Sequence, residues 1–154
     1  MPFDIHVTGD EEYRRKLAQL ELFLADLRTF WPLLVPVVGG WMRSQFESEG
    51  AWGGAQWAPL SPAYAAEKAR THPGKSILIR DGTLRRAASE MRREVTPRTL
   101  TMWIDSDVAG YHQDGTDKMP ARPLIPDPLP SSARIEVDAA AHEYVSVLVA
   151  RLGL

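Results

Sequence analysis

Apolar and polar positions repeat with a helical period along residues 10–31. The apolar side chains recur at alternating spacings of four and three, at Tyr13, Leu17, Leu20, Leu24, Leu27 and Trp31. Asp10 is placed to cap this segment, and acidic residues suit its first turn. The pattern predicts a long amphipathic helix. Its stripe has coiled-coil spacing but is short, so it can pack inside the domain, which we favour, or between subunits.

Four shorter segments also carry helix signals. Prolines interrupt the first pattern, and a second helix is expected from about Pro36 to Gly50. Gly39-Gly40 weakens this helix, and close packing on the first helix would offset that cost. Ser61-Pro62 is typical of a helix start, here for residues 62–69. A brief helix is expected after Asp81-Gly82-Thr83, and a terminal helix over residues 135–152. Helices therefore dominate the prediction.

Period-two alternation marks three short strands. Residues 3–7 alternate apolar and polar side chains and predict a half-buried strand that pairs with a later one. Residues 94–96 and 100–105 predict a hairpin that turns at Pro97-Arg98. We therefore expect an α+β fold, in which a small antiparallel sheet packs with long N-terminal helices and a C-terminal helix.

Residues 116–132 form a proline-rich segment, here called the proline arm. Five prolines fix φ and remove backbone donors, at Pro120, Pro123, Pro126, Pro128 and Pro130, so the arm is neither helix nor central strand. A turn at Asp114-Gly115 precedes it. A preformed extended arm binds at low entropic cost, and we expect it to lie on a neighbouring subunit. Arg122 either pairs with a carboxylate across that interface or serves as a surface charge.

Composition narrows the class of protein. The chain has 154 residues, 44% hydrophobic and 25% charged, which fits one globular domain over residues 1–154. It has no cysteine, so disulfides, thiolate zinc sites and cysteine nucleophiles are excluded. The net charge of -2 gives no general attraction to nucleic acid. The longest apolar run is too short for a bilayer and no signal pattern is present, so we expect a soluble protein without membrane association.

The chemistry of an enzyme is not visible in the sequence. No histidine has a second histidine at ligand spacing, and His142-Glu143 lacks the partner of a zinc-protease helix. His112, Asp114 and Asp117 remain as a metal candidate, but we interpret the aspartates as turn residues. A small hydrolase would need His112, Asp114 and His142 to converge. We expect no catalysis and no cofactor.

Two further groups of side chains are candidates for binding. Arg85, Arg86, Arg92 and Arg93 form the basic concentration, which we interpret as a solvated face and, alternatively, as a DNA-facing surface. Trp52 and Trp57 lie in a glycine-rich loop. We expect Trp57 to be buried and to fix the loop, and Trp52 to contact a partner.

Several motifs in order carry a resemblance to a known family. They are Gln45-Phe46-Glu47 with Gly50, Trp57-Ala58-Pro59-Leu60-Ser61-Pro62-Ala63-Tyr64 with Lys68, Ile77-Leu78, Gly82-Thr83-Leu84-Arg85, Tyr111-His112-Gln113-Asp114-Gly115 and Pro120-Ala121-Arg122-Pro123-Leu124. In this order they resemble the phage virion-morphogenesis, or tail-completion, family. The chain departs from the family pattern at Trp52-Gly53-Gly54, where a Pro-Asp-Gly-like turn is common, and at Leu124, where an aromatic residue is frequent.

The resemblance implies a structural protein of the phage neck or tail end that completes the tail and joins it to the head. It implies a homo-oligomeric ring, with tail terminator, tail tube or head-connector proteins as partners and passing contact with DNA. The protein would act in the host cytoplasm during assembly and then in the virion. We expect the interface at Trp52, Trp57, Leu60, Tyr111, His112, Gly115, Pro120, Arg122, Pro123 and Leu124. The alternative is a small DNA-binding or partner-binding module that uses residues 85–93.

Overall fold

The structure, a computed structural model, describes residues 9–154 and confirms an α+β fold that is mostly helical. The strand predicted at residues 3–7 lies outside the described residues. The elements in chain order are α1 (Asp10–Ala25), η1 (Leu27–Thr29), α2 (Trp31–Glu47), η2 (Ala51–Gly53), α3 (Pro62–Thr71), α4 (Thr83–Ser89), β1 (Arg92–Val95), β2 (Leu100–Trp103), α5 (Ala109–Asp114) and α6 (Ser131–Leu152).

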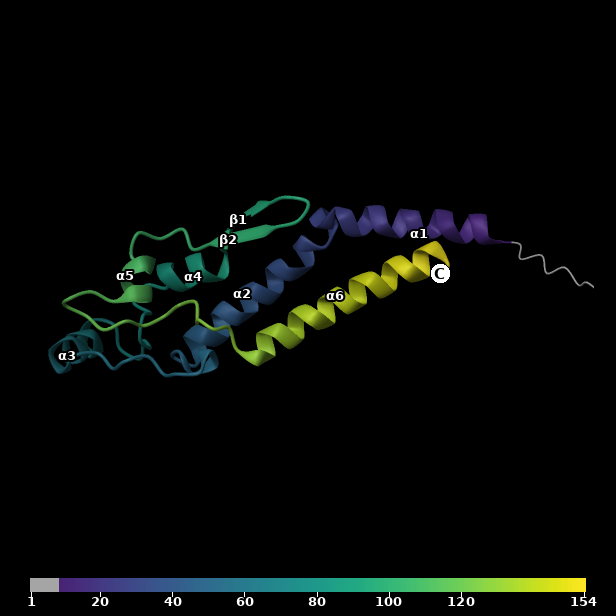
Figure 1. Ribbon diagram of the computed structural model, residues 1–154. Coiled ribbons are helices and arrows are strands. Elements are labelled where there is room, and N and C mark those ends of the chain that lie inside the picture. Colours follow the sequence, from purple (N-terminus) through teal and green to yellow (C-terminus); the bar gives the residue numbers. More distant parts are fainter. Residues whose placement is uncertain (1–8) are drawn as a thin grey trace, which may run out of the picture.

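Helix α2 runs through the middle of the molecule and organises the other elements. Figure 1 shows α6 running alongside α2, with its C-terminal end beside α1, while α3, α4 and α5 gather at the opposite end. The core forms where α2 meets α4 and the proline arm. Its buried side chains are Trp41, Met42, Phe46, Trp57, Leu84, Ala88, Met91, Leu124 and Ala133.

Helix α1 corrects two predictions. It ends at Ala25, because Asp26 is extended and its side chain accepts a hydrogen bond from the Arg28 backbone N–H, which starts the 3-10 turn η1 instead. Its apolar stripe was expected inside the core, but no residue of α1 is buried. Tyr13 and Leu17 are 55% and 44% exposed. Leu20, Leu27 and Trp31 are partly buried, so the chain covers the stripe only in part and the predicted place of the stripe in the core is wrong.

Helix α2 begins earlier than predicted. It starts at Trp31, with Pro32 in the first turn, and it continues through Pro36. The close packing expected at Gly39 is made with α4 and not with α1, since a Cβ atom on Gly39 would lie 3.0 Å from the Ser89 carbonyl oxygen. Glycine thus lets α2 and α4 approach each other.

The hairpin, α3 and the terminal helix are present as predicted, although α6 begins at Ser131, inside the predicted arm, and β1 begins at Arg92. β1 and β2 pair antiparallel, with Arg92 opposite Trp103 and Val95 opposite Leu100. The Ser61 hydroxyl caps α3 by accepting from the Tyr64 N–H. The hairpin tip is held by the junction between α1 and α2, where the Trp31 indole donates to the Thr96 carbonyl at 2.9 Å.

Among residues 9–154, no helix has the length and apolar character needed to cross a membrane.

Candidate functional site

The proline arm is part of the folded body, which corrects the prediction that it lies on a neighbouring subunit. Burial alternates along it, with Arg122, Leu124 and Pro126 buried while Pro123 and Ile125 between them are exposed. This is the period of an extended chain with one face against a core. Leu124 is 0% exposed. The arm is extended as predicted, but its inner face packs against its own chain.

Glutamine and tryptophan side chains hold the arm in place. The Gln113 amide oxygen accepts from the backbone N–H groups of Leu124 and Ile125, at 2.9 and 3.0 Å. From the other side, Gln45 Nε2 and Trp57 Nε1 both donate to the Pro123 carbonyl, at 2.9 and 2.8 Å. The arm has few backbone partners of its own, so these side chains satisfy polar groups that burial would otherwise leave unpaired.

Arg122 is bound within its own chain. Its Nε donates to the Ala58 carbonyl at 2.7 Å and its Nη2 to the Pro59 carbonyl at 2.8 Å. The residue is only 5% exposed. Burial contradicts the alternative of a surface charge. The planar fork, which was otherwise predicted to pair with a carboxylate across an interface, already spans two successive carbonyl groups of the loop before α3.

The predicted interface residues separate into three groups. Trp57, Arg122 and Leu124 are buried, which confirms the expected burial of Trp57 and removes all three from an exposed interface. Four residues are partly buried, namely Trp52, Leu60, His112 and Gly115. Three are exposed, namely Tyr111, Pro120 and Pro123. Any partner of this face would contact the last group directly.

Two of the partly buried residues have structural roles. The Trp52 ring stacks on Trp41, with 6.1 Å between ring centroids, and so helps to close the core. Gly115 ends α5 at the predicted Asp114-Gly115 turn, and its φ is 76°, whereas the helix before it was not predicted. A Cβ atom there would lie 2.7 Å from the Ala121 backbone nitrogen, so the returning arm requires glycine.

A cleft of about 800 Å³ lies beside the docked arm, at the end of the molecule where α3 and α5 gather. Its walls come from the start of α3, residues 78–84, the loop before α5, α5 itself and the arm. The apolar lining residues are Leu60, Leu78, Ile79, Leu84, Val108 and Met119, with the Tyr64 ring beside them. The volume falls in the range of small-molecule sites.

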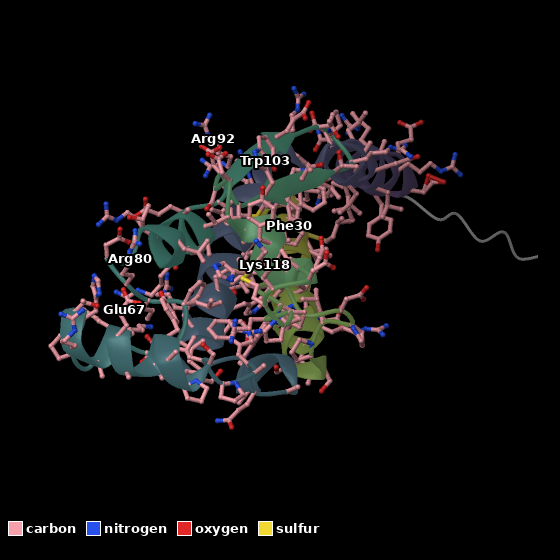
Figure 2. All side chains as sticks on the ribbon, turned by 90° about the vertical axis from the view of Figure 1, so that its left-hand side faces the viewer. Phe30, Glu67, Arg80, Arg92, Trp103 and Lys118 are labelled. Carbon is pink, nitrogen blue, oxygen red and sulfur yellow. The ribbon has the colours of Figure 1, made fainter. Side chains whose placement is uncertain are left out.

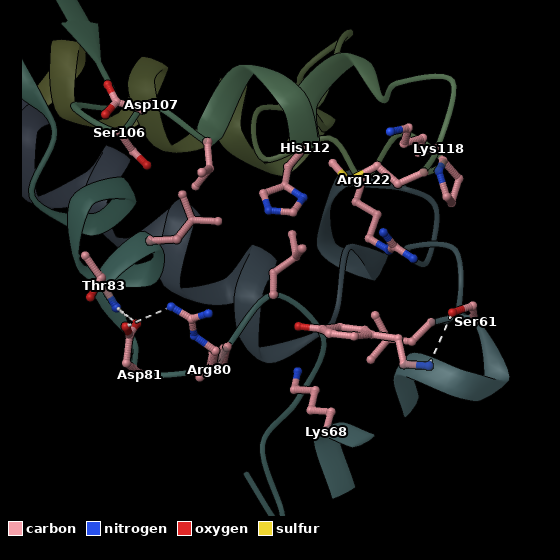
Figure 3. A pocket seen from close by; sticks show the side chains of 18 of the residues that line it. Ser61, Lys68, Arg80, Asp81, Thr83, Ser106, Asp107, His112, Lys118 and Arg122 are labelled. Carbon is pink, nitrogen blue, oxygen red and sulfur yellow. Dashed lines mark hydrogen bonds and ion pairs between the residues drawn. The ribbon is translucent and has the colours of Figure 1, made fainter. Parts of the chain in front are cut away.

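Basic side chains point into this cleft. Figure 3 shows His112 and Arg122 entering from one side and Lys68 from the opposite side. Lys68 is 6% exposed and donates to the Ser76 carbonyl. Burial lowers the pKa of Lys68; Glu49 opposes this shift and the Arg122 charge adds to it. Burial also lowers the pKa of His112, again with a contribution from Arg122.

His112 has an unusual environment for a polar ring. Its Nδ1 is buried and has no hydrogen-bond partner in the described part of the chain. The other groups proposed to act with it are elsewhere, since Asp114, Asp117 and His142 do not line the cleft. Within residues 9–154, no three His, Asp or Glu side chains are grouped to hold a metal ion. His112 therefore faces a cleft lined by cations and apolar groups, with Asp81, Asp105 and Asp107 also in its lining.

The four arginines proposed to face DNA lie on two elements. Arg85 and Arg86 are exposed on α4, and Arg92 and Arg93 are exposed on β1. Figure 2 shows Arg92 projecting outward near Trp103, on the same side of the molecule as Arg80. Arg92 Nε lies 2.7 Å from an Asp105 carboxylate oxygen. Neighbouring strand residues point to opposite faces, so Arg92 and Arg93 do not reinforce each other. DNA contact stays a prediction.

Sequence reasoning missed the roles of Gln45, Gln113 and Lys68, although each belongs to a motif that it identified. Gln45 and Gln113 bind the arm, and Lys68 lies on the cleft floor. The sequence did contain a signal for the role of Lys68, since Lys68 lies one helical turn after Tyr64 and therefore on the same face of α3. Both side chains line the cleft. No protein-family model, curated protein or solved structure matches this chain.

Proposed function

We propose that this chain is a phage structural protein of the neck or tail end, which completes the tail and joins it to the head through a ring-like oligomer. The ordered motifs support the proposal, and residues of four of them share hydrogen bonds at the arm, namely Gln45, Trp57, Gln113 and Pro123-Leu124. It would assemble in the host cytoplasm and remain in the virion. Its partners would be tail terminator, tail tube or head-connector proteins.

The observation that carries the proposal is the part of the α1 stripe that its own chain leaves exposed, since Leu20, Leu27 and Trp31 are partly buried and the end of α6 lies beside α1. Tyr13, Leu17 and Leu24 are 55%, 44% and 41% exposed on a helix that has no buried residue. An isolated helix of this length is marginal in water without a packed face. Rows of exposed apolar side chains mark interaction sites. The second alternative for the stripe, packing between subunits, therefore becomes the basis for assembly.

This proposal moves the subunit contact from the arm to α1. Removing the arm would delete core residues such as Leu124, so its loss would unfold the chain and would not leave a monomer. The exposed Tyr111, Pro120 and Pro123 remain available to a second structural protein. The two surfaces lie at opposite ends of the molecule in Figure 1, as an adaptor requires.

The test is the absolute mass of the purified protein by light scattering over a concentration series, followed by electron microscopy of the large species. We expect a discrete multimer with ring-shaped particles. Leu17→Glu places a charge on the stripe and should lower the mass. Ala18→Glu adds the same charge to the same helix beside the stripe and should preserve it. A monomer at every concentration, or equal effects of both variants, would contradict assembly through α1.

A further inference from the structure

The cleft beside the arm has more basic groups than its carboxylates neutralise. Lys68, Lys118 and Arg122 all line it, and no ion pair within residues 9–154 joins any of them to a carboxylate. Two of them, Lys68 and Arg122, are at least nine-tenths buried. Buried charges of one sign repel each other and normally have a partner of opposite sign.

The acidic side chains of the cleft are mostly engaged elsewhere. Asp81 accepts a hydrogen bond from the Thr83 N–H at 2.9 Å, and its carboxylate lies 3.7 Å from the Arg80 guanidinium. Asp105 pairs with Arg92 on the hairpin. Asp107 remains at the rim, on the loop before α5. Glu49 lies near Lys68 and opposes the effect of burial on it, but its Oε1 accepts from the Ile77 N–H at 2.7 Å and it makes no ion pair with Lys68 within residues 9–154. With Glu49 counted, Lys68 and Arg122 still leave the floor between α3 and the arm with an excess of positive charge.

Two cationic side chains with unused N–H donors line this cleft, beside a histidine ring whose Nδ1 has no partner. The Lys68 ammonium has three N–H donors and, among the described residues, makes one hydrogen bond, to the Ser76 carbonyl. Arg122 uses Nε and Nη2 for backbone carbonyls, and Nη1 makes no hydrogen bond within the described residues. The Nδ1 atom of His112 is buried without a partner. These groups enter the same cleft from opposite sides (Figure 3).

Apolar walls surround the charged floor. Leu60, Leu78, Ile79 and Val108 line the cleft together with the half-exposed Tyr64 ring. Such walls desolvate an apolar group, whereas the floor favours an anion. A strongly hydrated inorganic anion would leave the walls uncovered, and an apolar ligand without charge would leave the donors unpaired.

We propose that this cleft binds a carboxylate carried on an apolar group. The carboxylate would lie between Lys68 and Arg122, beside the His112 ring, and the apolar group would cover the walls. Two sources supply this chemistry, namely a free fatty or amino-acid-derived carboxylic acid and the C-terminal carboxylate of a polypeptide. The site depends only on the chain's own fold, so it stands apart from the proposed assembly through α1.

The first experiment titrates the full chain with hexanoate, N-acetyl-leucyl-leucine, hexylamine and inorganic phosphate, using calorimetry and the NMR signals of the His112 ring. We expect saturable binding of both carboxylates with movement of the His112 signals. The amide of N-acetyl-leucyl-leucine should bind at least tenfold more weakly, since it loses the charge-assisted hydrogen bonds. Comparison of hexanoate with the peptide distinguishes a free acid from a chain end.

Matched variants locate the site. Lys68→Gln removes a buried donor and should weaken hexanoate binding about tenfold or more, with circular dichroism to confirm folding. Lys118→Gln removes an exposed charge at the rim and should weaken it about two- to fivefold without a folding risk. Lys75→Gln makes the same charge change outside the cleft and should leave binding unchanged.

Three results would overturn the proposal. The first is binding of hexylamine or of the peptide amide as tightly as the carboxylates. The second is phosphate binding tighter than hexanoate, which would make the floor a general anion site without a role for the walls. The third is an equal response of the Lys118→Gln and Lys75→Gln variants, or the absence of any saturable shift at His112.

Discussion

Leu124→Ala tests whether the proline arm belongs to the monomer core. Leu124 is 0% exposed, and it contacts a cluster that includes Phe46 and Trp57. Truncating a fully buried leucine removes its transfer free energy and leaves a cavity, which together cost about 2–5 kcal/mol. Ile125 is the matched control, since it is the next residue of the same arm and is 38% exposed. Ile125→Ala should cost about 1 kcal/mol or less, because much of that side chain is already in water.

The two arm variants keep the same backbone hydrogen bonds. Gln113 accepts from the backbone N–H groups of both Leu124 and Ile125, and neither truncation touches those groups. The difference between the variants therefore reports side-chain burial alone. For a chain of this size, each kcal/mol lowers the melting temperature by about 2–4 °C. Leu124→Ala should then melt roughly 4–20 °C below the wild type.

Urea unfolding provides the free energies of unfolding of the two variants. It is followed by circular dichroism and tryptophan fluorescence, at a protein concentration where the chain is monomeric. The midpoint should fall for Leu124→Ala with little change in slope, and it should barely move for Ile125→Ala. Equal, small effects of the two variants would refute the docked arm. So would a Leu124→Ala protein that keeps its monomer stability and loses only its ability to assemble.

Two other predictions follow from the same core and cleft. Gly50→Ala should lower the free energy of unfolding by about 3 kcal/mol or more, because φ is 95° and the new Cβ would lie 2.6 Å from Trp57 Cδ1. Gly54→Ala has a similar φ of 100° but open space around the new Cβ, so it should lower that free energy by about 1–2 kcal/mol. Urea unfolding measures both values. Burial lowers the pKa of His112 below 6.5, so the unfolded chain binds this proton more readily. The contribution of the neutral ring to stability should therefore be complete above pH 6.5 and should be lost as the pH drops toward the lowered pKa. The His112→Gln variant should lose less stability over this pH range. Identical pH profiles of the two proteins would contradict the burial of the ring.

Local signals in the sequence predicted several elements correctly. The Ser61-Pro62 start of α3 depends on a hydroxyl cap and a fixed φ, and the hairpin depends on alternation on either side of a proline turn. Both are interactions between residues close in the chain. The bounds of α1 were wrong, since Asp26 forms a local hydrogen bond with Arg28 that ends the helix although the apolar spacing continues to Trp31. A short polar contact there outweighs the hydrophobic period.

The proline arm shows which part of the protein its sequence determined and which part the tertiary structure decided. Proline restricts φ in any context, so an extended segment was determined by the residues themselves. Whether that segment lies on its own body or on a neighbour depends on Gln45, Trp57 and Gln113. Gln45 and Trp57 bind the Pro123 carbonyl from far away in the chain, and Gln113 binds the Ile125 carbonyl from the helix before the arm. The cleft has the same origin, because Lys68 and Arg122 meet only after α3 and the arm have packed. Local conformation follows from covalent geometry, whereas binding surfaces arise from contacts that exist only in the folded chain.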